Sequence, residues 1–243
     1  MAGRRVRIRA LTVLALIGLG LGWAVMARAT TRQGIDFRVS TRSVPAAVKA
    51  LDFLHRHIHY GLLAREITRG SRSEEGRARA VFDWTRAAVR PSPPGWPVVD
   101  DHILHIIIRG HGLEDQQADV FATLATYAGV PAFWRTVRLE EGTPGLVLSF
   151  ARIDGRWTMW DVANGLVFAD PGGRLMDVDR LLADPGAVEA VAGSLAPGGV
   201  PYVRYVRRLR PFRVPEMLRA RAQMPLPRLA YELRSVLAPR SAP

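Results

Sequence analysis

The sequence predicts an α+β fold in which helices pack on an antiparallel sheet, preceded by an N-terminal transmembrane helix. Three observations predict this class. Apolar residues recur at helical spacing in the first half of the chain, and apolar runs flank a two-residue Asp-Gly turn in the second half. A charge-free apolar run follows four arginines at the N-terminus. The 243 residues suffice for one such domain with appendages.

Composition narrows the functional classes. The formal net charge is +12, and Lys49 is the only lysine among 34 basic residues. Basic chains attract nucleic acid, anionic lipid or acidic glycan, but no zinc-finger spacing, basic zipper or RNA-binding motif is present, so we expect no nucleic-acid partner. The chain has no cysteine, which excludes disulfides, thiolate metal sites and a cysteine nucleophile. We expect neither a cofactor nor a metal.

Residues 1–29 have the pattern of a signal anchor. Arg4, Arg5, Arg7 and Arg9 precede the apolar run 10–27, which at about 1.5 Å per residue nearly spans a hydrocarbon core of about 30 Å. The positive-inside rule keeps the arginines in the cytoplasm. We therefore expect a single-pass protein of the cytoplasmic (inner) membrane whose domain faces outside the cytoplasm, in the periplasm. Ala27-Arg28-Ala29 also fits a cleavage site, and cleavage after Ala29 would give a secreted protein.

The next segments predict a linker followed by helices. Residues 30–44 are polar and read as a linker or short strand, and the domain proper is expected over 45–175. Residues 45–60 have helical periodicity, and Ser73 can cap a second helix over 74–89. The proline-rich stretch 91–97 is a loop. Residues 100–109 are short, apolar and ambiguous between strand and helix.

Residues 114–128 give the clearest helix. Val120, Phe121 and Leu124 lie on one stripe, and Glu114 and Asp115 occupy the first turn, where acidic groups favour the positive helix end. Gly129 follows as a helix-terminating residue.

Three strands should follow, over 131–139, 146–153 and 156–162, and residues 167–175 are expected to form a turn or another edge strand. Asp154-Gly155 is a strong hairpin signal. A two-residue loop there pairs Ile153 with Arg156, so Leu146, Leu148, Phe150, Met159 and Asp161 share one face of the sheet.

Residues 176–243 are expected to form a basic C-terminal extension. Residues 178–182 look helical, residues 185–201 look like loop, and the arginine-rich stretch after 202 is broken by prolines. Its arginines suit a solvated face or contact with anionic lipid headgroups or acidic glycan.

Several short motifs resemble the transglutaminase-like superfamily. Residues 109–116 (RGHGLEDQ) resemble the glycine-rich turn before the family's catalytic cysteine, and residues 128–132 (AGVPA) resemble its helix–strand joint. Residues 146–157, ending in DGRW, resemble the strand that begins with the catalytic histidine, and Trp160-Asp161 resembles the strand with the catalytic aspartate. The resemblance covers about residues 75–165 and implies a papain-like fold.

The resemblance implies a Cys-His-Asp triad that this chain has largely lost. In the family a thiolate attacks a carbonyl, the histidine transfers a proton and the aspartate orients the histidine. The cysteine position falls on Leu113 and the histidine position on Leu146, so only Asp161 remains. We therefore expect a pseudoenzyme without catalytic residues.

Three functional readings remain open. The leading one is a non-catalytic binding or assembly protein of the bacterial cell envelope, with an envelope protein or glycan as partner; whole-chain resemblance associates it with surface polysaccharide systems. The second is a hydrolase with a rebuilt His/acid site near His111 and Asp161, and the third is a purely structural subunit whose groove the two leucines fill. An open groove would support binding, and its candidate residues are His111, Glu114, Asp115, Gln116, Trp134, Trp160 and Asp161.

Overall fold

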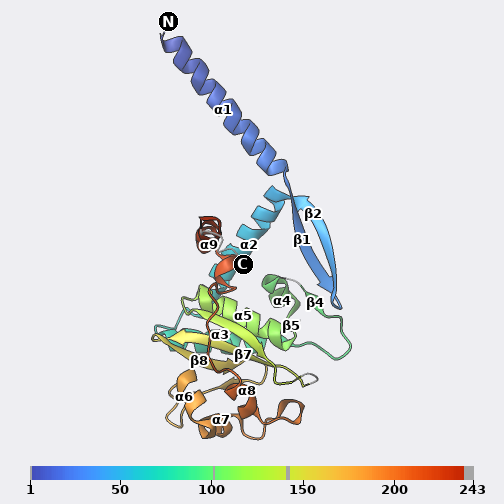
Figure 1. Ribbon diagram of the computed structural model, residues 1–243, viewed down its shortest axis with the longest axis vertical. Helices are drawn as coiled ribbons and strands as arrows, with labels where there is room; N and C mark the ends of the chain where they lie inside the picture. Colours follow the sequence, from blue (N-terminus) through green and yellow to red (C-terminus); the bar gives the residue numbers. More distant parts are fainter. Residues whose placement is uncertain (1, 101, 141–142, 238–243) are drawn as a thin grey trace. The chain divides into compact units, whose positions relative to one another are not determined.

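The computed structural model describes residues 2–100, 102–140 and 143–237. The chain divides into two compact units, Met1–Arg56 with Pro97–Asp101 and His57–Trp96 with His102–Pro243. Each unit is described by itself below, and Figure 1 shows their elements.

The first unit contains one long helix and a small sheet. Helix α1 spans Ala2–Met26. Strands β1 (Arg28–Ile35) and β2 (Arg38–Pro45) form an antiparallel hairpin whose turn has Asp36 and Phe37 at positive φ, and β4 (Val99–Asp100) pairs with β1. The residues expected as a linker or short strand over 30–44 are thus mostly strand. Among the described residues, no helix is long and apolar enough to cross a membrane.

Helices dominate the first half of the second unit. It includes the later part of α2 (Ala46–Ile67), then α3 (Glu74–Ala88), α4 (Ile103–Arg109) and α5 (Glu114–Tyr127). Ser73 caps α3 as expected, because its Oγ accepts a hydrogen bond of 3.0 Å from the Gly76 amide. The ambiguous segment 100–109 is mostly helix. The short strands β3 (Arg90–Pro91) and β5 (His111–Gly112) pair in parallel.

A four-stranded antiparallel sheet forms the centre of this unit. Its strands are β6 (Ala132–Val137), β7 (Leu146–Ile153), β8 (Arg156–Asp161) and β9 (Leu166–Val167), in that order. Ile153 pairs with Arg156 and Phe150 with Met159, so the predicted hairpin register is confirmed. The register places alternate side chains of β7 on opposite faces of the sheet.

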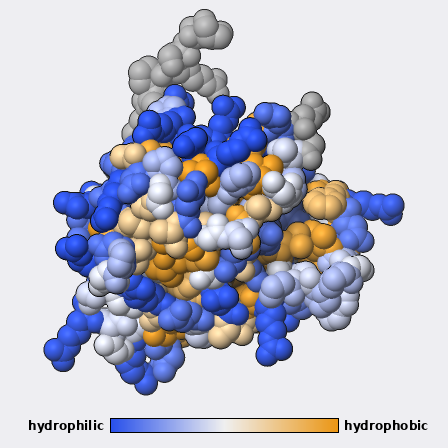
Figure 2. Space-filling model, turned by 90° about the horizontal axis from the view of Figure 1, so that it is seen from below, coloured by the Kyte–Doolittle hydropathy of each residue, from blue (hydrophilic) through white to orange (hydrophobic). Residues whose placement is uncertain are grey.

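Both faces of this sheet are apolar, and each carries its own core. Helices α3 and α5 cover one face, where Phe82, Phe121 and Trp160 pack together. The other face is covered by α6 (Val178–Ala183), α7 (Pro185–Ala192) and α8 (Tyr202–Arg207), with Phe150 and Met159 in the core beneath them (Figure 1). Figure 2 shows the side of the molecule with these helices, where apolar residues gather between hydrophilic ones at the rim.

The C-terminal segment is more ordered than its composition suggests. The prediction of loop over 185–201 is wrong for 185–192, because Asp184 caps α7 with a 3.2 Å hydrogen bond to the Ala187 amide and Pro185 occupies the first turn. Single-turn 3₁₀ helices lie at Pro197–Gly199 and Arg221–Gln223, and α9 spans Pro225–Leu237. Prolines therefore begin helices in this segment as well as breaking them.

The hairpin turn gives a first testable prediction. Gly155 has φ of +81°, and a Cβ there would meet nothing within 4 Å, whereas Gly70 has the same open space without positive φ. Gly155→Ala should lower the free energy of unfolding by about 1 kcal/mol through backbone strain alone, and Gly70→Ala should not. Urea unfolding of both variants measures this. Equal effects at the two positions would show that the turn does not require glycine.

Candidate functional site

The N-terminus of α5 has an ordered hydrogen-bond arrangement. Leu113 is the N-cap residue, and its backbone N–H donates to Gln116 Oε1 at 3.0 Å. The same oxygen accepts from Arg109 Nη2 at 3.2 Å. The side chain of Leu113 offers no acceptor to the amides of the first turn, so the cap depends on Gln116.

Two acidic side chains stand in the first turn of α5. Asp115 Oδ1 accepts from the Gln116 amide at 2.9 Å. The pKa of Glu114 is raised, first by partial burial and then by the negative charges of Asp161 and Asp115. The structure thus brings Glu114, Asp115 and Asp161 into one electrostatic neighbourhood.

Asp161 is buried and bonded within the protein. Its Oδ1 accepts from the Asn164 backbone N–H at 3.0 Å, and its Oδ2 accepts from Asn164 Nδ2 and from the Tyr202 hydroxyl, each at 2.8 Å. Burial raises the pKa of Asp161, and these bonds together with the charge of Arg86 oppose the rise. Burial and the neighbouring carboxylate raise the pKa of Tyr202 well above 10, so its hydroxyl stays protonated and donates.

The positive charge of Arg86 lowers the pKa of this carboxylate. Its guanidinium lies 5.8 Å from the centroid of the Phe82 ring and packs against Gly165. Gly165 has φ of +73°, and a Cβ there would lie 2.3 Å from Arg86 Cζ. The absence of a side chain at this position lets the guanidinium lie against the backbone after β8.

The two leucines that the sequence predicts at the family's catalytic positions differ in burial. Leu146 is 2% exposed and belongs to the core beneath α6–α8. Leu113 is half-buried at the start of α5. Trp160 is fully buried between Phe82 and Phe121, and its Nε1 donates to Thr158 Oγ1 at 2.9 Å. Leu146, Trp160 and Asp161 are therefore core residues with no surface for a ligand.

His111 has local partners of its own. Its ring meets Trp96 edge-on at 4.8 Å between centroids, and Nδ1 lies 3.4 Å from Ser92 Oγ. Among the described residues, no group of three or more His, Asp or Glu side chains is placed to hold a metal ion. Asp101 lies outside the described residues. The contacts found at His111 are thus with a hydroxyl and an indole.

A second buried acid lies further along α5 and was not singled out by sequence reasoning. Asp119 is 5% exposed, and its Oδ2 lies 3.1 Å from Arg219 Nε. Burial raises the pKa of Asp119, while Arg219 and a hydrogen bond from Trp134 lower it. The guanidinium of Arg219 also lies 6.0 Å from the Trp134 ring centroid. Trp134 therefore joins an ion pair between α5 and the C-terminal segment.

Comparison with known proteins agrees with this architecture. Residues 62–163 match the model of the transglutaminase-like superfamily. No curated protein matches the chain. The helices packed on an antiparallel sheet are thus a transglutaminase-like fold.

Two solved structures share weaker likeness. One, described as a putative cysteine protease from Cytophaga hutchinsonii, is 16% identical with a TM-score of 0.39, and the match covers 50% of this chain and 41% of that one. Another, described as a putative protease from Parabacteroides distasonis, is 15% identical with a TM-score of 0.33, covering 54% of this chain and 35% of that one. The chain spans less than half the length of either.

Sequence reasoning found Asp161 but missed its partners. Asn164 lies three residues later, and an aspartate before such a turn is a local signal for this bonding. Tyr202 lies 41 residues away, and no local pattern links it to Asp161. Asp119 and Arg219 are likewise joined only by the fold.

The Tyr202 hydrogen bond gives a prediction with a defined pH dependence. Tyr202→Phe removes a bond to a buried carboxylate, which should cost about 1.5–3 kcal/mol at pH 7. The folded-state pKa of Asp161 lies above its ordinary value. Ionisation of Asp161 therefore lowers the stability of the folded state as the pH rises from the ordinary pKa to the folded-state pKa. The variant raises this pKa further, so its cost should grow with rising pH and shrink toward pH 4.

Urea unfolding at pH 4.5 and 7, followed by tryptophan fluorescence, measures this difference. Tyr205→Phe is the matched control on the same helix, because the Tyr205 hydroxyl bonds the neutral carbonyls of Pro144 and Pro197. Its cost should not change between the two pH values. A Tyr202→Phe cost as independent of pH as the control would refute an ionised Asp161 at neutral pH.

Arg219→Gln tests the ion pair with Asp119. The variant leaves a buried carboxylate without its cation, but Arg219 itself is 63% exposed, so we expect a cost of about 1–3 kcal/mol, below that of a fully buried pair. Arg204→Gln, which breaks the exposed pair with Glu140, should change stability by less than about 0.5 kcal/mol. Thermal unfolding compares the stability of the two variants. Equal small losses would mean that the buried Asp119 carboxylate does not need the charge of Arg219 for stability.

Proposed function

We propose that this chain is a non-catalytic, transglutaminase-like assembly protein of the bacterial cell envelope, attached to the membrane through α1. One observation carries the proposal most strongly. At the place of the family's histidine stands the buried Leu146, and the remaining Asp161 is bonded to Asn164 and Tyr202. The position that holds the triad in the family is filled by apolar core and satisfied hydrogen bonds.

Loss of the nucleophile argues against acyl transfer. The chain contains no cysteine, and leucine cannot attack a carbonyl or transfer a proton. Removal of a triad nucleophile typically lowers turnover by about 10⁶-fold. Residual acids at the start of α5 do not replace a thiolate.

The buried groove residues favour assembly over capture of a small ligand. Leu146, Trp160 and Asp161 have no exposed surface with which to contact a substrate. A protein that keeps the fold but fills its cleft retains only its outer surfaces for interaction. An envelope protein or an acidic glycan, such as one of a surface polysaccharide system, suits the net charge of +12.

The N-terminal pattern supports a membrane location. Four arginines precede the apolar run 10–27, and α1 is one continuous helix over Ala2–Met26. Leu14, Leu16, Ile17, Leu19 and Trp23 are each more than half exposed on this helix. Exposed apolar side chains suit a hydrocarbon environment better than water. Cleavage after Ala29 is the alternative fate of this segment.

A rebuilt hydrolytic site is the second candidate function. The raised pKa of Glu114 beside Asp161 is the observation that favours it, because perturbed acids often mark reaction sites. A general acid at Glu114 with His111 nearby in sequence would then act on an amide or a glycosidic bond.

Turnover assays separate these two functions. We expect wild-type protein to show no amide hydrolysis or transamidation above background. A Leu113→Cys/Leu146→His variant should gain a single alkylatable thiol but no turnover, because the buried Asp161 carboxylate already accepts hydrogen bonds from Asn164 and Tyr202 and would have to be shared with the new histidine. Hydrolysis by wild-type protein that disappears in Glu114→Gln or His111→Gln would establish the rebuilt site instead.

Arginine substitutions within the apolar run 10–27 test the proposed membrane anchor. Arginine near the centre of a spanning helix costs about 2.5–3.5 kcal/mol per residue on insertion scales. Leu16→Arg/Leu19→Arg should therefore move the chain from the carbonate-resistant membrane fraction to the soluble fraction. Val39→Arg, at an exposed strand position, should leave fractionation unchanged. A membrane fraction that contains wild type and both variants equally would exclude α1 as the anchor.

A further inference from the structure

Helix α9 and residues 216–221 border a surface groove. Its volume is about 640 Å³, and small-ligand sites occupy about 300–1,000 Å³. The lining residues of α9 follow one another at intervals of one, three and four, and so form one face of the helix: Pro227, Ala230, Tyr231, Arg234 and Ser235. Met217 and Leu218 give the other wall an apolar surface. None of the residues predicted at the family's catalytic positions lines this groove.

The wall opposite α9 is attached to the body of the second unit. Leu218 is 7% exposed and belongs to the core beneath α6–α8. The single-turn helix Arg221–Gln223 follows, and the Gln223 carbonyl accepts a hydrogen bond of 2.9 Å from the Tyr127 hydroxyl on α5. The backbone of this wall is therefore held in place before any ligand arrives, and such preorganisation lowers the cost of binding.

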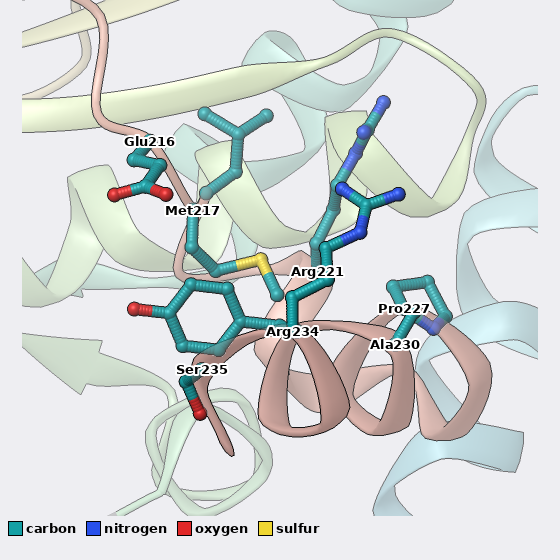
Figure 3. Close-up of a pocket in the computed structure, with 9 residues that line it drawn as sticks. Glu216, Met217, Arg221, Pro227, Ala230, Arg234 and Ser235 are labelled. Atoms are coloured by element: carbon teal, nitrogen blue, oxygen red, sulfur yellow. The ribbon is translucent and has the colours of Figure 1, made fainter. Parts of the chain in front are cut away.

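Three charged side chains line the groove without pairing with one another. Figure 3 shows Arg221 and Arg234 extending in the same direction, with Glu216 on the other side of Met217 in this view. Within the described part of the chain, none of the three forms an ion pair. The groove thus presents two cations and one anion that are available to a ligand.

We propose that this groove binds a sugar acid, the carboxylate-bearing unit of an acidic glycan. Arg221 and Arg234 donate charge-assisted hydrogen bonds to the carboxylate. Tyr231 provides an aromatic surface for the apolar side of the sugar ring, and Glu216 accepts hydrogen bonds from sugar hydroxyls. The inference rests on the proposed interaction with an acidic glycan and assigns a site to it.

The mixed charge of the groove favours a sugar acid over a phosphate. A phosphate monoester carries a charge of about −1.5 to −2 at pH 7, which Glu216 repels. A sugar acid carries a single negative charge beside several hydroxyl donors, and a carboxylate can accept those hydroxyls. Tyr231, which is 41% exposed, and Met217 add apolar contact area that an inorganic anion would not use.

Calorimetric titration with a matched pair of oligosaccharides tests the ligand class. Full-length wild-type protein in detergent micelles is titrated with tetragalacturonate and with the methyl ester of the same tetrasaccharide, which keeps the rings but lacks the charges. We expect tetragalacturonate to bind at least about tenfold more tightly, because the ester cannot accept charge-assisted hydrogen bonds. Inorganic phosphate at the same concentration should not displace it. Equal affinities for acid and ester, or displacement by phosphate, would overturn the proposal.

Substitutions in the groove test its residues. Arg221→Gln/Arg234→Gln should weaken tetragalacturonate binding at least about tenfold, and Tyr231→Ala should weaken it about three- to tenfold. Arg228→Gln is the matched control, because Arg228 lies on α9 outside the groove lining and pairs with Glu232 at 3.9 Å. It should leave the affinity unchanged. Thermal unfolding verifies that each variant is folded, and the comparison of acid with ester on wild type needs no variant.

The groove and the proposed function can fail separately. Tetragalacturonate binding that is unchanged in Arg221→Gln/Arg234→Gln would locate the glycan elsewhere on the chain and overturn the groove inference alone. Absence of tetragalacturonate binding to wild type would also overturn the groove inference. Amide hydrolysis by wild-type protein would instead overturn the proposed non-catalytic function, whether or not the groove binds the tetrasaccharide.

Discussion

The second unit is organised by a sheet that is apolar on both faces. Along β7, every side chain except Arg152 is buried, because neighbouring residues point to opposite faces and both faces are covered. One layer of helices cannot bury such a strand. Helices α3 and α5 cover one side, and the residues after 176 must supply α6, α7 and α8 for the other. Leaving the second face open would expose Phe150, Met159 and their neighbours to water, at about 25 cal/mol for each Å² of apolar surface.

This second layer also covers the positions that we propose correspond to the family's catalytic histidine and aspartate. Leu146 and Asp161 lie on the face covered by α8, so the helix that completes the core brings Tyr202 against the Asp161 carboxylate. A tyrosine hydroxyl donates one hydrogen bond and fills the adjacent space with an apolar ring. A buried carboxylate would otherwise be costly, and the bonds from Asn164 and Tyr202 offset part of that cost. Packing of α8 on the sheet therefore both closes the core and supplies a hydrogen bond to the Asp161 carboxylate.

The sequence predicted the helices, caps and turn that short local patterns specify. It did not predict contacts between residues that are far apart in the chain and meet only in the fold. The Asp154-Gly155 turn determines the pairing of Ile153 with Arg156, because a two-residue loop leaves one register. The stripe of α5 and the Ser73 cap follow equally from short-range rules. Tyr202 and Asp161 are far apart in the chain, and the same holds for Arg219 and Asp119. Helix α7 was missed because the whole stretch 185–201 contains three prolines and four glycines, although Asp184-Pro185 is a helix-start signal.

A filled catalytic position changes the balance between stability and activity. An active cleft keeps an uncovered nucleophile and a polar histidine at the core's edge, and both arrangements cost stability. Leucine at position 146 instead buries its side chain among apolar neighbours, which is worth about 1.5–3 kcal/mol relative to exposure. A histidine there would lose solvation and would have to share the Asp161 carboxylate with Asn164 and Tyr202. Because the chain has no cysteine, regaining a triad at the proposed positions would require changes at several positions at once.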